Sequence, residues 1–298
     1  AELPRDGDVP LAVVAGGAFD FELLASVSAL GEDMLLDVID RLLDRHLLVE
    51  PRRPDRPDFA LTHARYTEVA YEMIPEVRCR HLHRQIAGAL QKLTVDLDAI
   101  AGALAHHYER GRAYDEAFGW LVRAAEVAQR RYALSEALAF CHRAIALPVG
   151  EPAPVLLMMG HLAHQLARYD EGAAYYEQAL IRWQALGEPT REIEAHYGAA
   201  ECYREMSSFN EALRHARSGL DQAQDLEGER VLEQVARGHI MVSNAMRSGQ
   251  LGSVSAIRDH LEAAFDLAES IGAQRLMGEA TFWLGVVTVN AGDPRGAL

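Results

Sequence analysis

The chain has 298 residues, of which 49% are hydrophobic and 24% are charged, so it can bury a core and is not intrinsically disordered. The 44 acidic residues exceed the 29 basic ones, and the resulting formal charge of −15 disfavours direct contact with nucleic acid or an anionic membrane. A chain of this length is typical of about two domains, or of one domain followed by a repeat array.

Cysteine usage and hydropathy indicate a cytoplasmic protein. Cys79, Cys141 and Cys202 lie far apart and form no CxxC motif, which favours a reducing compartment. The longest segment without Asp, Glu, Lys or Arg, residues 152–167, is too short to span a bilayer. The chain starts at Ala1 rather than at Met and stops within a helical pattern, so we expect it to be part of a longer protein.

Residues 1–63 predict a small winged-helix domain. The expected order is a helix over 20–29, a helix over 32–46, a strand at 47–49, a proline-rich wing loop and a strand at 59–61. Asp20 is the expected N-cap of the first helix. The second helix carries mostly acidic residues, which disfavours docking of this domain into the major groove of DNA.

Residues 64–94 are expected to form two linking helices. The helical pattern covers residues 64–73 and 77–93, and Pro75 interrupts it between them.

Residues 95–298 predict an array of tetratricopeptide repeats. Small residues recur there at fixed spacing, because two antiparallel helices approach closely only where a small side chain lies between them. The pattern covers residues 104–124, 156–179 and 196–219, a looser unit over 230–268, and a last repeat that starts at Leu284. An additional helix is expected over 134–147. The residues predicted to pack between helices are Ala105, Ala117, Ala124, Gly160, Gly172, Ala179, Ala200, Ala212, Gly219 and Gly285.

The expected fold is therefore all-α. A winged helix with a two-stranded wing and two linking helices precede an α-α superhelix of repeats.

No catalytic or metal site is predicted. The motifs GxSxG, HExxH and GxxxxGK[ST] are absent from the sequence. Cys79, His81 and His83 lie close together, but further zinc ligands at suitable spacing are missing. We therefore expect this chain to bind no metal and not to be an enzyme.

Five motifs occur in an order that resembles one bacterial family. They are FDFELL (19–24), LLDRHLL (42–48), FALTH (59–63), YEMIPEVRCRHLH (71–83) and LAHHY (104–108). In this order they resemble the winged-helix and repeat region of STAND regulators, the signal-transduction ATPases with numerous domains. That family includes transcription activators related to the maltose-regulon activator and regulators of antibiotic pathways. The resemblance covers essentially the whole chain.

This resemblance implies a role for His63. In the family the winged helix acts as a hinge, and a histidine at the start of the helix after its second strand faces the β-phosphate of ADP. His63 matches that position, and an imidazole can donate a hydrogen bond to phosphate. Capping of the following helix or packing under the wing is the alternative. ATP or ADP binding is expected only together with an N-terminal nucleotide-binding core, because this chain has no phosphate loop.

The repeat array offers a concave surface lined by the first helix of each repeat. In the basic repeat register, the residues expected to project from it are His106, Glu109, His161, His164, Tyr197, Glu201, Arg204, His239 and Arg247. This mixture of charged and aromatic groups suits a protein or peptide partner, or a small inducer. The alternative is a solvated face without a ligand, and self-association stays open.

Together these features predict the sensor region of a STAND-type transcriptional regulator. The repeats would bind the effector, and the winged helix would relay binding to a nucleotide switch outside this chain. The alternatives are a STAND protein with a cyclase or kinase output, and a free-standing repeat scaffold that binds peptides.

Overall fold

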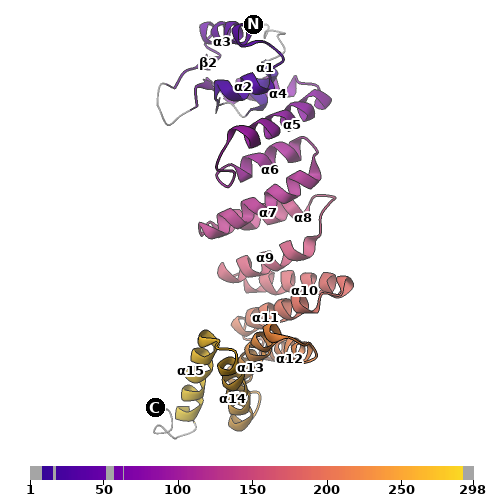
Figure 1. The fold of residues 1–298 in the computed structure, drawn as a ribbon, viewed down its shortest axis with the longest axis vertical. Helices are drawn as coiled ribbons and strands as arrows, with labels where there is room; N and C mark the ends of the chain where they lie inside the picture. Colours follow the sequence, from indigo (N-terminus) through magenta and orange to yellow (C-terminus); the bar gives the residue numbers. More distant parts are fainter. Residues whose placement is uncertain (1–8, 16–17, 52–56, 63, 291–298) are drawn as a thin grey trace. The chain divides into compact units, whose positions relative to one another are not determined.

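The computed structural model describes residues 9–15, 18–51, 57–62 and 64–290. Over these residues the chain is predominantly α-helical, as predicted (Figure 1). Its contacts divide it into two compact units. The first comprises Ala1–Arg130 with Ala146–Gly150, and the second comprises Arg131–Ile145 with Glu151–Leu298.

The first unit begins with short helices around a small sheet and continues as longer helices. Its elements are α1 (Val9–Val14), β1 (Ala18–Phe19), α2 (Phe21–Val27), α3 (Glu32–Asp44), β2 (Leu48–Val49), β3 (Phe59–Leu61), α4 (Ala64–Glu72), α5 (Glu76–Leu93), α6 (Ala101–Arg110) and α7 (Tyr114–Arg130). The strands are antiparallel in the order β1-β3-β2, so the sheet has one strand more than predicted. Neither β1 nor α1 was predicted, because each is too short to show a period in the sequence.

The start of α2 is held by a distant carboxylate rather than by its own N-cap residue. Asp20 occupies the predicted N-cap position, but its side chain makes no capping bond to α2. Instead, the backbone N–H of Phe21 donates to Asp58 Oδ2 at 2.9 Å, and the backbone N–H of Asp58 donates to Asp20 Oδ1 at 3.2 Å. An acceptor at this end of a helix satisfies a free backbone donor. These two bonds therefore tie α2 to the chain just before β3.

The core of the first unit lies between the sheet, α2, α3 and α5. Leu35, Ile39 and Leu42 recur on one face of α3 and are buried, as their spacing predicted. The rings of Phe19 and Phe59 pack across the sheet with centroids 5.9 Å apart.

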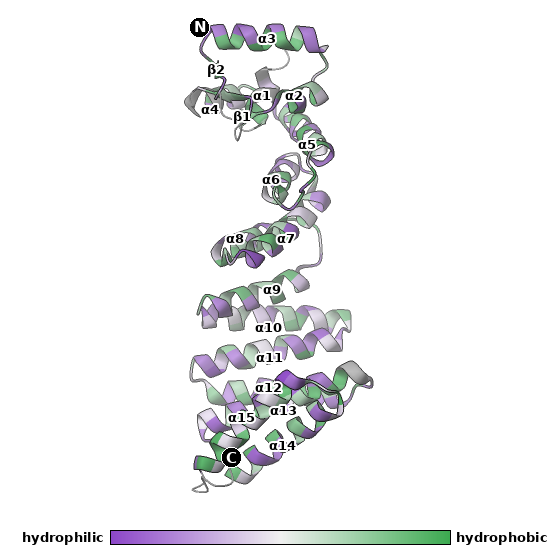
Figure 2. Cartoon of the chain, turned by 60° about the vertical axis from the view of Figure 1, so that its left-hand side comes forward, coloured by the Kyte–Doolittle hydropathy of each residue, from purple (hydrophilic) through white to green (hydrophobic). Residues whose placement is uncertain are grey.

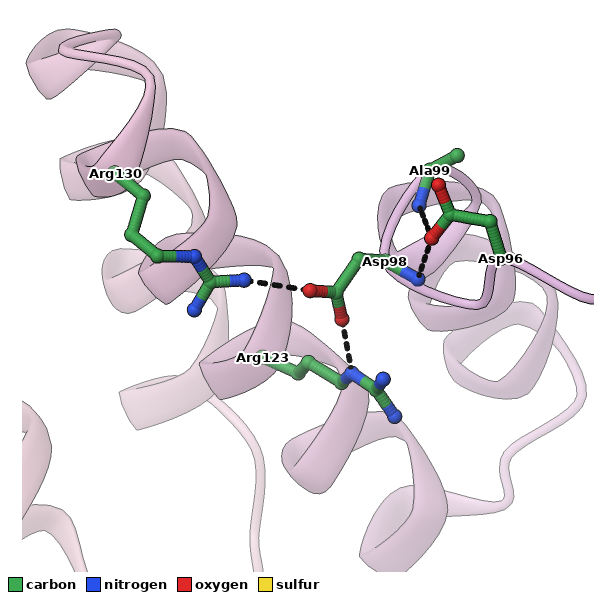
Figure 3. Close-up of polar contacts among 5 residues, drawn as sticks. All are labelled: Asp96, Asp98, Ala99, Arg123 and Arg130. Atoms are coloured by element: carbon green, nitrogen blue, oxygen red, sulfur yellow. Dashed lines mark hydrogen bonds and ion pairs between the residues drawn. The ribbon is translucent and has the colours of Figure 1, made fainter.

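Asp98, just before α6, forms ion pairs with two arginines of α7 (Figure 3). Its Oδ1 accepts from Arg123 Nε and its Oδ2 from Arg130, each at 2.6 Å. Asp96 Oδ1 accepts from the backbone N–H groups of Asp98 and Ala99, which fixes the turn that presents Asp98. Because all three charged partners are partly exposed, these ion pairs orient α6 and α7 more than they stabilise them.

The second unit is helical throughout the residues described. Its elements are α8 (Leu134–Ile145), α9 (Pro152–Gln165), α10 (Tyr169–Leu186), α11 (Pro189–Glu205), α12 (Phe209–Gln224), α13 (Glu229–Gly249), α14 (Val254–Ser270) and α15 (Gln274–Asn290). Each helix from α9 to α15 packs on the one before it, and both hydrophobic and hydrophilic residues occur along these helices (Figure 2). No helix among the described residues is long and apolar enough to cross a membrane.

The first helix of each pair ends in the same left-handed turn. Ala167, Ser207 and Gln250 have φ of 57°, 58° and 53°, and each lies just after a first helix. The following residue then donates its N–H back to the last helical turn, as Ser208 does to the Tyr203 carbonyl at 2.8 Å. This shared turn reverses the chain and starts the second helix of the pair.

Two buried tyrosines pack against glycines of neighbouring helices. The Tyr176 ring lies against Gly160 of α9 and Gly198 of α11, where a Cβ atom would clash with it. The Tyr197 ring lies in the same way against Gly219 of α12, and its hydroxyl donates to the Gln234 carbonyl of α13 at 3.0 Å. Glycine is needed at these positions because the aromatic ring occupies the volume of a side chain.

We expect Gly198→Ala to destabilise the second unit by about 1–3 kcal/mol, because its methyl group would overlap the Tyr176 ring in a packed core. Gly278→Ala on α15 is the matched control. No atom lies within 4 Å of the Cβ that it would add, so we expect it to stabilise by about 0.5–1 kcal/mol through helix propensity. Urea denaturation of the two variants measures both effects. Equal midpoints would contradict the tyrosine–glycine packing.

The small residues predicted to pack between helices are mostly buried. All of them except Gly285, which is partly exposed, are buried: Ala105, Ala117, Ala124, Gly160, Gly172, Ala179, Ala200, Ala212 and Gly219.

Candidate functional site

The first helices of the second unit form a common face. The helices α9, α11, α13 and α15 contact one another in succession, whereas the second helices α10, α12 and α14 contact one another less. A stack whose helices are closer together in one layer curves towards that layer. The side that α9, α11, α13 and α15 share is therefore the inner side of this unit, and we call it the inner face.

Polar residues occupy equivalent positions of two adjacent first helices. On α11 these are Glu194, Glu201 and Arg204, and on α13 they are Arg237, Asn244 and Arg247. Each member of the second set lies 43 positions after its counterpart, and within each set the spacing of seven and three residues keeps all members on one helix face. The inner face thus carries a repeated row of charged and amide groups.

At one end of the inner face, acidic side chains are balanced by a neighbouring arginine. His161 of α9 is influenced electrostatically by Glu194 and Glu201 of α11 and by Arg237 of α13, so the three helices bring these groups together. Burial is the largest effect and lowers the pKa of His161, the two glutamates raise it, and Arg237 lowers it. Arg237 also lies over the Tyr197 ring, 5.6 Å from its centroid. Cationic and anionic groups balance one another here.

The other end of the inner face is basic. The guanidinium of Arg247 lies 3.8 Å from the centroid of the Trp283 ring of α15. Burial lowers the pKa of Arg247, and the positive charge of Arg204 lowers it further. Among the described residues Arg247 makes no hydrogen bond or ion pair, and its buried Nε is unsatisfied. The buried Oδ1 of Asn244, one turn earlier, is also unsatisfied.

The predicted ligand-binding residues divide into three groups in the structure. His161, Glu201, Arg204 and Arg247 lie on the first helices of the second unit, as does His164, whose ring contacts Tyr169 of α10. His106 and Glu109 lie on α6 of the first unit. Tyr197 is buried, and His239 is partly buried and paired with a histidine of the next helix.

The positions of Tyr197 and His239 correct the sequence prediction. Tyr197 is 1% exposed because its ring fills the space above Gly219, and His239 is hydrogen-bonded to His260 of α14. Sequence reasoning missed Glu194, Arg237 and Asn244. Their common offset from one first helix to the next was the signal that indicated them.

Three pairs of histidines link adjacent helices through their Nδ1 atoms. The distances are 2.9 Å for His83–His107, 3.0 Å for His196–His215 and 2.8 Å for His239–His260. Burial is the main cause that lowers the pKa of each of these histidines, to about 3 for His83 and to about 4 for His107, His196, His215 and His239. The pKa of His260 is lowered for the same reason.

These pairs are neutral near pH 7, so in each pair one Nδ1–H donates to the other Nδ1. Arg214 lies 3.0 Å from His215 Nε2 and can only donate, which makes this Nε2 an acceptor. His215 therefore carries its proton on Nδ1 and donates it to His196.

The first unit contains a cleft of about 390 Å³ between α4, α5, α6 and the start of α7. Its charged lining is largely paired, because Glu76 forms ion pairs with Arg80 and Arg112, at 2.7 and 2.8 Å. Cys79 lies buried in this cleft. No group of three or more metal-ligating side chains occurs within the part of the chain that is described. His63 lies outside the described residues.

Comparisons with known proteins agree with the fold. The tetratricopeptide-repeat family profile matches residues 152–225, which span α9 to α12. The apo form of RapI is similar in structure, with a TM-score of 0.59, 12% identity, and 97% of this chain and 74% of that chain covered. The apo quorum sensor NprR from B. thuringiensis gives 0.52 with 15% identity over 78% and 66% of the two chains. A Rap protein complexed with Competence and Sporulation Factor gives 0.50 with 16% identity over 74% and 68%. No curated protein matches the chain in sequence.

Proposed function

We propose that the inner face of the second unit binds a peptide, or an extended segment of a protein, and that this chain is the sensor part of a regulator. The observation that carries this proposal is the repeated polar row of α11 and α13, which includes buried polar atoms of Asn244 and Arg247 without a partner. A partner that brings its own donors and acceptors would satisfy them. The Rap protein bound to Competence and Sporulation Factor and the quorum sensor NprR support a sensing role for this architecture.

An extended peptide fits this face better than a compact molecule. Packed helices lie about 8–10 Å apart. An extended chain advances about 3.3 Å per residue, so about three residues span the distance from one first helix to the next. Such a peptide would meet an equivalent row of side chains at each helix that it crosses.

Residues 1–94 would relay the bound state to a nucleotide switch outside this chain, as in STAND regulators. The support is the ordered set of motifs and the helix and strand order of α2, α3, β2 and β3, and His63 would contact the nucleotide. In this proposal the chain has no catalytic activity of its own, and transcription is the output that the resemblance favours.

We expect peptides selected from a random phage-displayed library to bind the whole chain and to lose at least tenfold in affinity in Asn244→Ala or Glu201→Ala. A tenfold loss corresponds to about 1.4 kcal/mol of binding free energy. Gln178→Ala, at an exposed position of the second helix α10, is the matched control and should change the affinity less than twofold. Fluorescence anisotropy with the selected peptides measures the dissociation constants. Peptides that lose affinity only in the Gln178 variant would contradict the proposed face.

A further inference from the structure

The cleft of the first unit lies where α4 meets the helices that follow it. The last turn of α4 forms one wall, and α5, the end of α6 and the start of α7 form the others, while α4 itself packs on α1 and β3. Two contacts join these walls: the Tyr71 hydroxyl lies 2.9 Å from His83 Nε2 of α5, and the guanidinium of Arg110 lies 5.4 Å from the centroid of the Tyr71 ring. A molecule bound in the cleft would therefore contact α4 and the later helices at once.

Two opposite charges of the cleft are not neutralised by the protein. Glu76 pairs with Arg80 and Arg112. Glu72 of α4 and Arg110 at the end of α6 form no ion pair within the residues that the structure describes, and there the buried Nε of Arg80 has no hydrogen-bond acceptor. The cleft thus offers an unpaired cation, an unpaired carboxylate and a free N–H donor to one ligand.

The size and lining of the cleft suit a small organic molecule rather than a bare ion. Its volume of about 390 Å³ lies within the range of small-molecule sites, and Tyr71, Ile74 and Tyr114 provide carbon atoms for an apolar part of the ligand. A bare anion would also meet Glu72, and a bare cation would also meet Arg110. A molecule that carries both charges satisfies each side chain with the matching group.

We propose that this cleft binds a small zwitterion of the free amino-acid type. The anionic group accepts hydrogen bonds from Arg110 and from Arg80 Nε, and the ammonium group pairs with Glu72. The ligand holds α4 against α5 and α6, so its binding is transmitted to α1 and β3, on which α4 packs. All of these residues belong to the first unit, so the site is separate from the inner face and does not depend on peptide binding.

Calorimetric titration of the whole chain with each of the twenty free amino acids tests the proposal. We expect at least one of them to bind and to lose about tenfold or more in affinity when its amino group is acetylated or its carboxylate is amidated. Glu72→Gln should abolish the discrimination against the acetylated form, and Arg110→Gln should abolish that against the amide. Glu68→Gln, at an exposed position of the same helix α4 and outside the cleft, is the matched control and should keep both.

The three cysteines show where the amino acid binds. Cys79 lines the cleft, whereas burial raises the pKa of the Cys141 and Cys202 thiols to about 12 and makes them unreactive. The chain is treated with iodoacetamide, and mass spectrometry follows the alkylation of each cysteine. At about ten times its dissociation constant, the bound amino acid should slow the reaction of Cys79 about tenfold, because only the empty cleft reacts.

The outcomes leave no ambiguity about the cleft. Absence of binding by all twenty amino acids would overturn the proposal. An amino acid that binds equally to Glu72→Gln and Arg110→Gln, or that leaves the alkylation of Cys79 unchanged, would bind elsewhere and would overturn it as well. Both side chains are exposed, so their replacement should leave the fold intact, and an unchanged far-UV circular dichroism spectrum checks this. None of these results affects the peptide-binding proposal, because the two sites share no residue.

Discussion

Ala212→Arg is expected to unfold much of the second unit, with a loss of roughly 3 kcal/mol or more in the free energy of unfolding. Ala212 is completely buried on α12, which packs between α11 and α13. A long cationic side chain at this position cannot reach solvent without separating these helices, and buried there it would be unpaired. Denaturation in urea, followed by far-UV circular dichroism, measures the shift of the midpoint.

Asn210→Arg is the matched control for this variant. Asn210 lies two residues earlier on the same helix and is exposed, so the same side chain should remain in solvent and change the stability by about 0.5 kcal/mol or less. If both variants unfold at the same urea concentration as the wild type, α12 does not bury this side and the repeat register is wrong.

The second large effect is a loss of stability on mild acidification, caused by the histidine pairs. The pKa of His196 and of His215 is lowered from 6.5 to about 4 in the folded state, so the unfolded chain takes up protons first as the pH falls. The two histidines contribute fully to the unfolding free energy above about pH 6.5. This contribution decreases between pH 6.5 and 4 and does not change further at lower pH. At 1.36 kcal/mol per unit of pKa, this lowering corresponds to a loss of about 3 kcal/mol of unfolding free energy per histidine over this range.

Neighbouring charged groups both raise and lower the pKa of His215. Arg214 lowers its pKa and Glu211 raises it, while Glu177 Oε1 lies 3.8 Å from its Nε2 and Tyr203 stacks on its ring. Burial nevertheless remains the largest effect, and it opposes protonation.

Paired asparagine substitutions test the assignment. The double variant His196→Asn, His215→Asn keeps an amide near each Nδ1 position and removes the titrating groups. We expect the decrease in unfolding free energy between pH 6.5 and 4.5 to become smaller, and the equivalent change at His239 and His260 to act additively. Chemical denaturation at several pH values measures this pH dependence of the unfolding free energy. An unchanged pH dependence in both double variants would show that the histidine pairs do not couple to folding.

The sequence predicted the repeat helices well because their close packing requires small residues at a regular spacing, and this spacing is visible in the sequence. Gly160 and Gly172 recur at the spacing that close helix contact requires, and both are buried at such contacts. The predicted helix over 134–147 is likewise present as α8, Leu134–Ile145. The strand β1 has no such pattern in its sequence, because its two residues form a strand only by pairing with β3.

The inner face was predicted in part, and its errors have physical causes. Tyr197 lies at a position that faces outwards in the basic register, but glycines on α12 and α13 open a space that its ring enters. His239 lies 43 positions after His196, which is the equivalent position on α13, and like His196 it pairs with a histidine of the following helix. Contacts of this kind depend on helix rotation, which no short motif encodes.

The two buried tyrosines limit how freely this array can be shortened or extended. The ring of Tyr176, on α10, packs against glycines of the two flanking helices α9 and α11. The hydroxyl of Tyr197, on α11, donates a hydrogen bond to a backbone carbonyl of α13. Removing the pair α11 and α12 would also remove Gly198, against which the Tyr176 ring packs. Amide hydrogen exchange across α9–α13 should accordingly proceed in a single concerted opening instead of fraying stepwise from one end, because the neighbouring pairs share side chains and not merely surfaces.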